Sequence, residues 1–168
     1  MRSLLKLKDT SILASMGNSV MEKICELPEV KGARTIFSYW SLPSEAPTQI
    51  LNNKLSEKNK VLLPVIDGNN LYLSEYTQGN EMMTDNVYSI PEPTGEPFKA
   101  YNSIDVAIIP GLAFSESGLR CGKGKGYYDK TLEQMPSVYK IGLCFSFQLV
   151  DNIPVDSHDI TMDKVIVI

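Results

Sequence analysis

Three short apolar runs do most to limit the folds that this chain can adopt. They read DVAIIPG at residues 105–111, YKIGLCF at 139–145 and DKVIVI at 163–168, and none alternates between polar and apolar positions. Continuous runs of this kind are typical of strands buried on both faces of a parallel sheet. Parallel strands need a crossover connection, and a helical pattern from about 128 to 135 supplies one between the first two runs. The sequence therefore predicts a mostly parallel sheet.

The N-terminal half predicts further helices and strands for the same architecture. Apolar residues spaced by four and then three from Ile12 to Leu27 indicate a helix, which Pro28 helps to end. Residues rich in β-branched and aromatic side chains predict strands at 34–40 and 60–66. The other expected elements are a helix starting at Pro47, a turn at Asp67-Gly68, a short strand at 71–76 and a loop between Tyr76 and Tyr101.

Length and composition favour one α/β domain. A chain of 168 residues with 43% hydrophobic content is long enough for one well-buried core. Helices on both faces of a mostly parallel sheet make a Rossmann-like three-layer architecture. We expect it to span residues 1–168 as a single domain.

Charge and cysteine usage exclude several classes of protein. The chain has 16 Lys and Arg against 20 Asp and Glu, a net charge of −4, which argues against coating nucleic acid or an anionic membrane. No apolar run approaches the roughly 18 residues of a membrane span, and the N-terminus lacks a signal-peptide pattern, so we expect a cytoplasmic protein. Cys25, Cys121 and Cys144 show no CxxC or Cys/His pairing, which disfavours a disulfide framework or a structural zinc site.

The stretch RCGKGKGYYD at residues 120–129 is the strongest candidate for a binding site. It lies between a predicted strand and a predicted helix, where open α/β sheets bind ligands. Its glycines let backbone N–H groups approach an anion, and Arg120, Lys123 and Lys125 add cations. The spacing matches neither the P-loop nor the dinucleotide pattern GxGxxG. The residues alone leave two interpretations, a phosphate-binding loop or a flexible surface loop with solvated lysines.

Acidic residues near this stretch are candidates for a metal site. Asp129 follows the loop, where a carboxylate would help to hold Mg²⁺ against bound phosphates, but the residues alone favour an acid in a first helical turn, stabilised by the helix dipole. Asp156 and Asp159 offer a second carboxylate, although a polar turn explains them equally well. His158 is the only histidine, and we expect it to be exposed and without a catalytic role.

A second candidate segment is SYWSLPSEAPT at residues 38–48, which also leads from a predicted strand into a predicted helix. Trp40 has the shape to stack on a planar ring, and Glu45 has the oxygens to accept hydrogen bonds from ring N–H groups. Equally, Trp40 is a core residue and Glu45 an acid in the first helical turn. The residues alone leave both interpretations open.

The segment IIPGLAFSESGLRCGKGKGYYDKTL at residues 108–132 resembles the signature of the 5-formyltetrahydrofolate cyclo-ligase family, also called 5,10-methenyltetrahydrofolate synthetase. The family pattern is close to PGLAFD..G.RLG.GKGYYD. The segments LLPV, IPEP and IGLCFSFQLVDNIPVDSHDITMDKVI also resemble the family, so the likeness covers nearly the whole chain from about residue 16.

The resemblance implies an ATP- and Mg²⁺-dependent ligase of folate one-carbon metabolism. Such an enzyme converts 5-formyltetrahydrofolate to 5,10-methenyltetrahydrofolate with release of ADP and phosphate. Its partners are this folate and ATP, with no nucleic acid and no membrane, and we expect a monomer or a weak homodimer.

The resemblance also implies roles for individual residues. The family's ATP-contacting loop corresponds to Arg120, Cys121, Gly122, Lys123, Gly124, Lys125, Gly126, Tyr127 and Tyr128. Its folate contacts correspond to Trp40, Glu45, Lys123, Gly124, Lys125, Gly126 and Tyr127. The metal ligands correspond to Asp129 and Asp159, and the expected catalytic residues are Arg120, Lys125 and Tyr127.

The chain departs from the family pattern at three places. The family begins with a helix whose Lys-x-x-Leu-Arg-like motif reaches the ATP phosphates, whereas Arg2, Lys6 and Lys8 fall after that motif by spacing. Cys121 stands where leucine is usual, and Pro47 where an acid is frequent. A catalytically impaired folate- or nucleotide-binding homologue is therefore an alternative. Another enzyme on a similar sheet, such as a sugar-phosphate isomerase, is a third, but it has no use for paired carboxylates.

Overall fold

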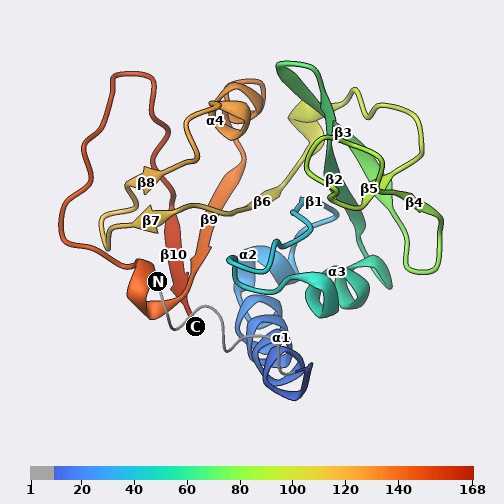
Figure 1. Ribbon diagram of the computed structural model, residues 1–168, viewed down its shortest axis with the longest axis horizontal. Coiled ribbons are helices and arrows are strands. Elements are labelled where there is room, and N and C mark those ends of the chain that lie inside the picture. Colours follow the sequence, from blue (N-terminus) through green and yellow to red (C-terminus); the bar gives the residue numbers. More distant parts are fainter. Residues whose placement is uncertain (1–9) are drawn as a thin grey trace.

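A six-stranded sheet runs through the middle of the molecule. The computed structural model describes residues 10–168 (Figure 1). The strands of this sheet are β1 (Thr35–Phe37), β2 (Lys60–Asp67), β3 (Asn70–Tyr76), β6 (Val106–Ile109), β9 (Tyr139–Cys144) and β10 (Lys164–Val167). Their order is β10-β9-β6-β1-β2-β3, and every neighbouring pair is parallel except β2 and β3, which form an antiparallel hairpin. The predicted mostly parallel sheet is confirmed.

The three apolar runs become β6, β9 and β10, but they differ in burial. All four residues of β6 are buried, whereas Lys164 of β10 is exposed and the rest of that strand is only partly buried. The prediction of a strand buried on both faces is therefore wrong for β10. The physical reason is its place at the edge of the sheet, where it pairs with β9 alone among the described strands.

Helices cover both faces of the sheet, as predicted. They are α1 (Thr10–Cys25), α2 (Pro28–Lys31), α3 (Gln49–Ser56) and α4 (Tyr127–Leu132), with 3₁₀ turns η2 (Tyr101–Ser103) and η3 (Ser146–Gln148). Figure 1 shows α1, α2 and α3 gathered on one side and α4 on the other. α4 supplies the expected crossover between the parallel strands β6 and β9.

The two faces form two apolar clusters. Ile24 of α1 and Leu51 of α3 pack in one cluster with Ile36, while the neighbouring Phe37 points into the other cluster with Leu132 of α4. Adjacent strand residues face opposite sides of a sheet, so β1 contributes to both. All five side chains are at most 2% exposed, and each contributes roughly 1.5–3 kcal/mol of hydrophobic free energy by burial.

The N-terminal helix ends slightly earlier than its apolar spacing suggests. α1 ends at Cys25, and Leu27 lies outside it. Pro28 does not simply end this helix but opens the short α2 at its first position, where a missing N–H costs no hydrogen bond. The strand expected at 34–40 is shorter in the structure, where β1 covers only Thr35–Phe37. The residues that follow, 38–48, form a loop beyond its carboxyl end.

Shorter elements complete the fold around the carboxyl ends of the strands. β4 (Met82–Met83) pairs with β5 (Glu92–Pro93), and β7 (Ala113–Phe114) pairs with β8 (Arg120–Cys121). Both pairs lie in connections that the sequence predicts as loops. No helix within residues 10–168 is both long enough and apolar enough to cross a bilayer.

Candidate active site

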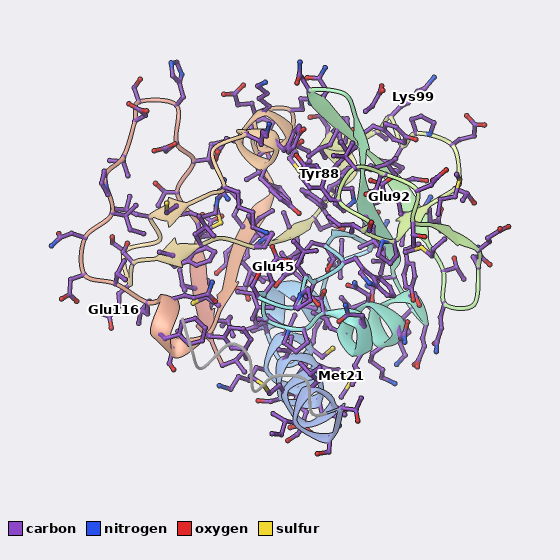
Figure 2. The ribbon with its side chains drawn as sticks, in the orientation of Figure 1. Met21, Glu45, Tyr88, Glu92, Lys99 and Glu116 are labelled. Atoms are coloured by element: carbon purple, nitrogen blue, oxygen red, sulfur yellow. The ribbon has the colours of Figure 1, made fainter. Side chains whose placement is uncertain are left out.

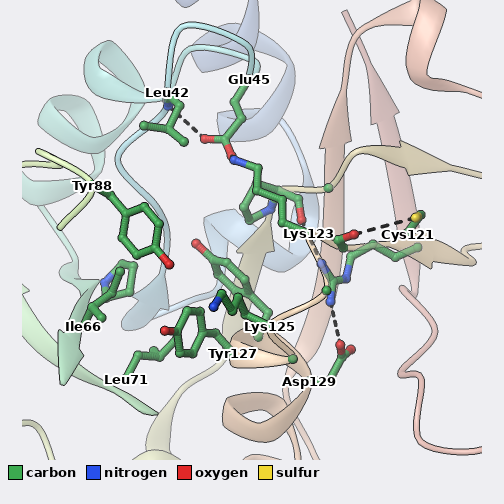
Figure 3. Close-up of a pocket in the computed structure, with 18 of the residues that line it drawn as sticks. Leu42, Glu45, Ile66, Leu71, Tyr88, Cys121, Lys123, Lys125, Tyr127 and Asp129 are labelled. Carbon is green, nitrogen blue, oxygen red and sulfur yellow. Dashed lines mark hydrogen bonds and ion pairs between the residues drawn. The ribbon is translucent and has the colours of Figure 1, made fainter. Parts of the chain in front are cut away.

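A cavity of about 530 Å³ lies beyond the carboxyl ends of β1, β2 and β6 (Figure 3). One side is the Gly–Lys segment, defined as residues 120–129. The opposite side, called the apolar wall here, consists of Trp40, Leu42, Pro64, Ile66 and Leu71. Parallel strands bring their carboxyl ends to one edge, which explains why loops far apart in the sequence meet there.

The Gly–Lys segment combines a rigid start with an open middle. Arg120 on β8 is 8% exposed, and its guanidinium donates to the carbonyl of Pro110 (3.2 Å) and to Asp129 Oδ2 (2.9 Å). A Cβ at Gly122 would lie 3.0 Å from Arg120 Nη1, so glycine allows this approach. Gly124 and Gly126 have φ angles of +84° and +67°, with open space where a side chain would be.

The start of α4 adds the two tyrosines of the segment. Tyr127 lines the cavity and its hydroxyl donates to the carbonyl of Gly68 (3.1 Å) in the β2–β3 turn. The ring of Tyr128 stacks on Phe37 at a centroid distance of 5.9 Å and also faces the Arg120 guanidinium. Burial, and then the nearby Glu45 carboxylate, raise the pKa of the Tyr128 hydroxyl, so it stays protonated. Tyr127 therefore borders the open space, while Tyr128 anchors α4 to the core.

Glu45 reaches the cavity from the loop after β1. Its side chain is 8% exposed, one oxygen accepts the N–H of Leu42 (2.8 Å) and the other pairs with Lys123 Nζ (2.8 Å). Trp40 lines the same cavity and makes an edge contact with Tyr76 (centroids 5.8 Å apart). The structure therefore brings Trp40 and Glu45 together with the Gly–Lys segment, as the resemblance implies.

The acidic residues predicted as metal ligands also meet at this cavity. Asp129, Asp156 and Asp159 all line it, the last two from the turn before β10. Asp159 Oδ2 accepts the N–H of Asp156 (2.6 Å), and Asp129 already pairs with Arg120. No group of three or more potential ligands gathers within residues 10–168. His158 is exposed and is not among the residues that line the cavity.

Several residues of the site escape sequence reasoning. The apolar side chains of β2 and β3 carry no functional signature, and Tyr88 and Glu92 come from the proline-rich connection that the sequence predicts only as a loop. Glu92 is 7% exposed, and its Oε1 accepts the N–H of Ile66 (3.0 Å). Burial raises the pKa of this carboxyl. The one available signal was the IPEP motif, which contains Glu92.

A smaller hollow of about 160 Å³ adjoins the main cavity. Glu45, Gly111 and Lys123 belong to the lining of both. Its outer rim includes the half-exposed side chains of Leu112 and Phe147. The Lys123–Glu45 ion pair therefore stands between the two spaces.

The basic residues Arg2, Lys6 and Lys8 lie outside the described part of the chain.

Comparisons with known proteins point to one family. Residues 3–168 match the model of the 5-formyltetrahydrofolate cyclo-ligase family. The Escherichia coli K12 5-formyltetrahydrofolate cyclo-ligase is 32% identical over 158 residues, covering 90% of this chain and 87% of that protein. The probable 5-formyltetrahydrofolate cyclo-ligase of Schizosaccharomyces pombe is 30% identical over 182 residues, covering 98% of this chain and 89% of that protein.

The same fold occurs in solved structures. The NMR structure of Aquifex aeolicus 5,10-methenyltetrahydrofolate synthetase superposes with a TM-score of 0.82 at 27% identity, covering 99% of this chain and 86% of that one. A 5,10-methenyltetrahydrofolate synthetase from Mycoplasma pneumoniae has a TM-score of 0.71 at 22% identity, covering 96% of this chain and 92% of that one, which shows the shared fold. The predicted α/β architecture is confirmed.

Proposed function

Because this chain belongs to the 5-formyltetrahydrofolate cyclo-ligase family and is an enzyme of that family, we propose that it cyclises 5-formyltetrahydrofolate to 5,10-methenyltetrahydrofolate. The proposed reaction consumes ATP and requires Mg²⁺. One observation carries the proposal: a single cavity has a cationic glycine segment on one side and, on the other, an apolar wall beside a buried acid.

The proposed chemistry has two steps. The formyl oxygen attacks the γ-phosphorus of ATP, so an O–P bond forms, the bond to the β-phosphate breaks and ADP leaves. N10 then attacks the activated formyl carbon and gives up its proton, and the C–O bond to phosphate breaks. The products are the methenyl folate, ADP and phosphate. Neither step needs a covalent enzyme nucleophile, so the protein contributes mainly by positioning and by charge stabilisation.

The Gly–Lys segment is proposed to hold the phosphates. Lys125 and Lys123 are exposed cations beside open glycine backbone, and ammonium and backbone N–H groups are suitable donors for phosphate oxygens. Arg120 lies buried in the lining of the cavity, so its guanidinium charge is close to the proposed phosphates. We therefore assign transition-state stabilisation to Lys125 and Arg120. The backbone around Gly122, Gly124 and Gly126, with Cys121 and Tyr128 flanking it, forms the rest of the nucleotide site.

The opposite side is proposed to hold the folate. Trp40 offers a flat apolar face for the pterin ring, and the Glu45 carboxylate is placed to accept a ring N–H. Tyr127 borders the space between the two ligands, which suits a role in orienting the formyl group. The apolar wall therefore suits the planar folate ring, and the charged groups of the facing segment suit the ATP phosphates.

The residues present fit a Mg²⁺ ion. Mg²⁺ usually takes one or two protein carboxylates and completes its shell with phosphate oxygens and water. Asp129 and Asp159 come from different elements and line the same cavity, so they fit this role without a third protein ligand. When bound, the ion neutralises charge on the phosphates. Arg120 holds the Asp129 carboxylate in place through the 2.9 Å ion pair.

A direct assay tests the proposal. The protein is incubated with 5-formyltetrahydrofolate, Mg²⁺ and ATP, and the methenyl product is followed by its near-ultraviolet absorbance while ADP is measured in parallel. We expect both products in equal amounts, and none when the β,γ-imido analogue replaces ATP. Nucleotide binding without any product at high enzyme concentration would contradict the proposal and support a binding homologue.

Matched lysine variants test the assignment of the cavity. Lys125→Ala should lower turnover, because a cation at the phosphates is lost. Lys99→Ala changes an exposed lysine that does not line the cavity, and Figure 2 shows Lys99 at the outer edge of the molecule. It should leave turnover unchanged.

We also expect a cytoplasmic enzyme that acts as a monomer or weak homodimer. Gel filtration coupled to light scattering tests the oligomeric state.

A further inference from the structure

One ion pair joins the two sides of the cavity. Lys123 Nζ of the Gly–Lys segment lies 2.8 Å from Glu45 Oε1, a carboxylate 78 residues away in the sequence (Figure 3). Under the proposed function, each partner also has a ligand of its own: the phosphates for Lys123 and a folate N–H for Glu45. The contact therefore links the two substrate sites directly.

Glu45 is the fixed partner of this pair. Its side chain is 8% exposed, and its second oxygen accepts the N–H of Leu42 (2.8 Å). The backbone N–H of Glu45 donates in turn to the carbonyl of Leu42 (2.9 Å), which closes a tight turn. Moving this carboxylate would break the part-buried hydrogen bond from the Leu42 N–H, so it stays in place when ligands arrive.

Lys123 is the partner that can move. Its side chain is 46% exposed, and glycines flank it on both sides. Gly124 has a φ of +84°, and nothing lies within 4 Å of the position where its Cβ would be. A flexible lysine stem on an open glycine backbone can swing its ammonium from the carboxylate to a nearby phosphate at little conformational cost.

The departure of Lys123 changes what Glu45 can bind. A buried carboxylate that loses its counter-ion is left with an uncompensated charge, which is strongly unfavourable. Any ligand that offers an N–H donor to Glu45 then binds more tightly, because it relieves this cost. A polyphosphate supplies the competing charge that draws the ammonium away.

From this geometry we propose that Lys123 couples the two substrates: ATP draws its ammonium from Glu45, and the freed carboxylate then binds the folate more tightly. The proposal rests on the proposed function, since it takes ATP and 5-formyltetrahydrofolate as the two ligands. Lys123 acts here as a positioning residue for the folate. Because linkage is reciprocal, the folate raises the affinity for the nucleotide by the same factor.

Equilibrium binding tests the coupling without any turnover. The dissociation constant of 5-formyltetrahydrofolate is measured by calorimetry, with and without a saturating amount of the β,γ-imido analogue of ATP and Mg²⁺. In the unmodified protein we expect the analogue to tighten folate binding by at least about five-fold, the low end of typical coupling factors. The reciprocal titration of the analogue should give the same factor.

Three variants separate this role from a structural one. In Lys123→Met and in Glu45→Gln the ion pair is absent, so the coupling factor should fall to about one. Lys125→Met removes the same charge from the same segment, but Lys125 has no ion pair with any residue in 10–168, so it should weaken nucleotide binding and keep the coupling. Thermal melting checks that each variant is folded.

The outcomes divide cleanly between the two proposals. Equal folate affinity with and without the analogue in the unmodified protein overturns the coupling and leaves the proposed function standing. Full coupling in Lys123→Met also overturns it, because the coupling then passes through other residues. No folate binding under either condition overturns the proposed function itself, and with it the coupling.

Discussion

The two sides of the cavity differ in how firmly the protein holds them. The apolar wall rests on β2 and β3, which are joined by a seven-residue antiparallel register, and on the loop that Glu45 and Leu42 close. The Gly–Lys segment is tied down at Arg120 and again at the start of α4, with open space around Gly124 and Gly126 between them. Under the proposed function, the planar folate ring therefore meets the firmly held side, and the phosphates meet the more open one.

The strongest test of this comparison is to break the Arg120–Asp129 ion pair, which anchors the Gly–Lys segment. Asp129→Ala removes the counter-ion of Arg120, whose side chain is 4% exposed. We expect turnover to fall by about 100-fold or more, the size seen when an electrostatic contact to the developing charge is lost. The free energy of unfolding should also fall by about 2–3 kcal/mol, less than for a fully buried pair because Asp129 is 22% exposed.

Asp129→Asn separates these two effects. The amide oxygen still accepts a hydrogen bond from Arg120, so most of the stability should return, while turnover stays low because the negative charge at the proposed Mg²⁺ position is gone. Urea denaturation and the absorbance assay measure the two quantities. Normal turnover in Asp129→Asn would remove Asp129 from the metal site.

Two glycines, one in the β7–β8 turn and one in the Gly–Lys segment, should respond very differently to the same substitution. A Cβ at Gly118 would lie 2.3 Å from the backbone carbonyl oxygen of Met162, and Gly118 has a φ of +91°. Gly118→Ala should therefore cost about 3 kcal/mol or more of stability through overpacking and backbone strain. Gly124→Ala meets open space and should cost about 1 kcal/mol, from its positive φ alone.

Urea unfolding of both glycine variants checks this difference. Gly124→Ala should in addition weaken nucleotide binding, since it would stiffen the segment that is proposed to hold the phosphates. Equal losses of stability at the two positions would show that the Gly–Lys segment is as tightly packed as the β7–β8 turn, and the comparison would fail.

The apolar wall should control folate affinity more than chemistry. Trp40→Ala removes a large flat face, and we expect KM for the folate to rise about 10-fold while kcat changes less, because burial of this ring contributes about 1.5 kcal/mol to binding. Trp40→Phe should recover part of the loss. A fall in kcat at unchanged KM would place Trp40 in the reacting centre instead.

The cysteines give the smallest and simplest contrast. Cys121 is exposed on the Gly–Lys segment, whereas Cys144 is fully buried on β9 and burial raises the pKa of its thiol to about 11. At pH 8 only about one in a thousand Cys144 thiols is ionised. A thiol reagent should label Cys121 first, and ATP should slow that labelling because Cys121 lines the cavity. Cys121→Ser should remove the fast phase.

Local sequence patterns predicted the elements whose geometry is repetitive. The apolar run at 105–111 predicted β6, and the helical spacing from Ile12 predicted α1. Both predictions were possible because the spacing of apolar residues is a property of neighbouring positions in the sequence. The same signals do not report which strand lies at an edge of the sheet. The prediction that β10 is buried on both faces was therefore wrong. Edge position depends on strand order, which is a property of the whole chain.

The Gly–Lys segment could be found from the sequence because its function lies in consecutive residues. The apolar wall could not, since Pro64, Ile66 and Leu71 look like ordinary strand residues until the hairpin turns them toward the cavity. Glu92 likewise becomes part of the site only because β5 brings it to the N–H of Ile66.

The sequence by itself therefore determined the parallel α/β architecture, the family resemblance and the residues of the glycine-rich segment. Only the tertiary structure decided that Lys123 pairs with Glu45, that Arg120 is buried against Asp129, and that Asp159 shares their cavity. The physical reason is the distance along the chain over which each kind of interaction acts. Backbone conformation and periodicity act over a few residues, whereas ion pairs and cavities depend on side chains that only the packed sheet brings within a few ångströms.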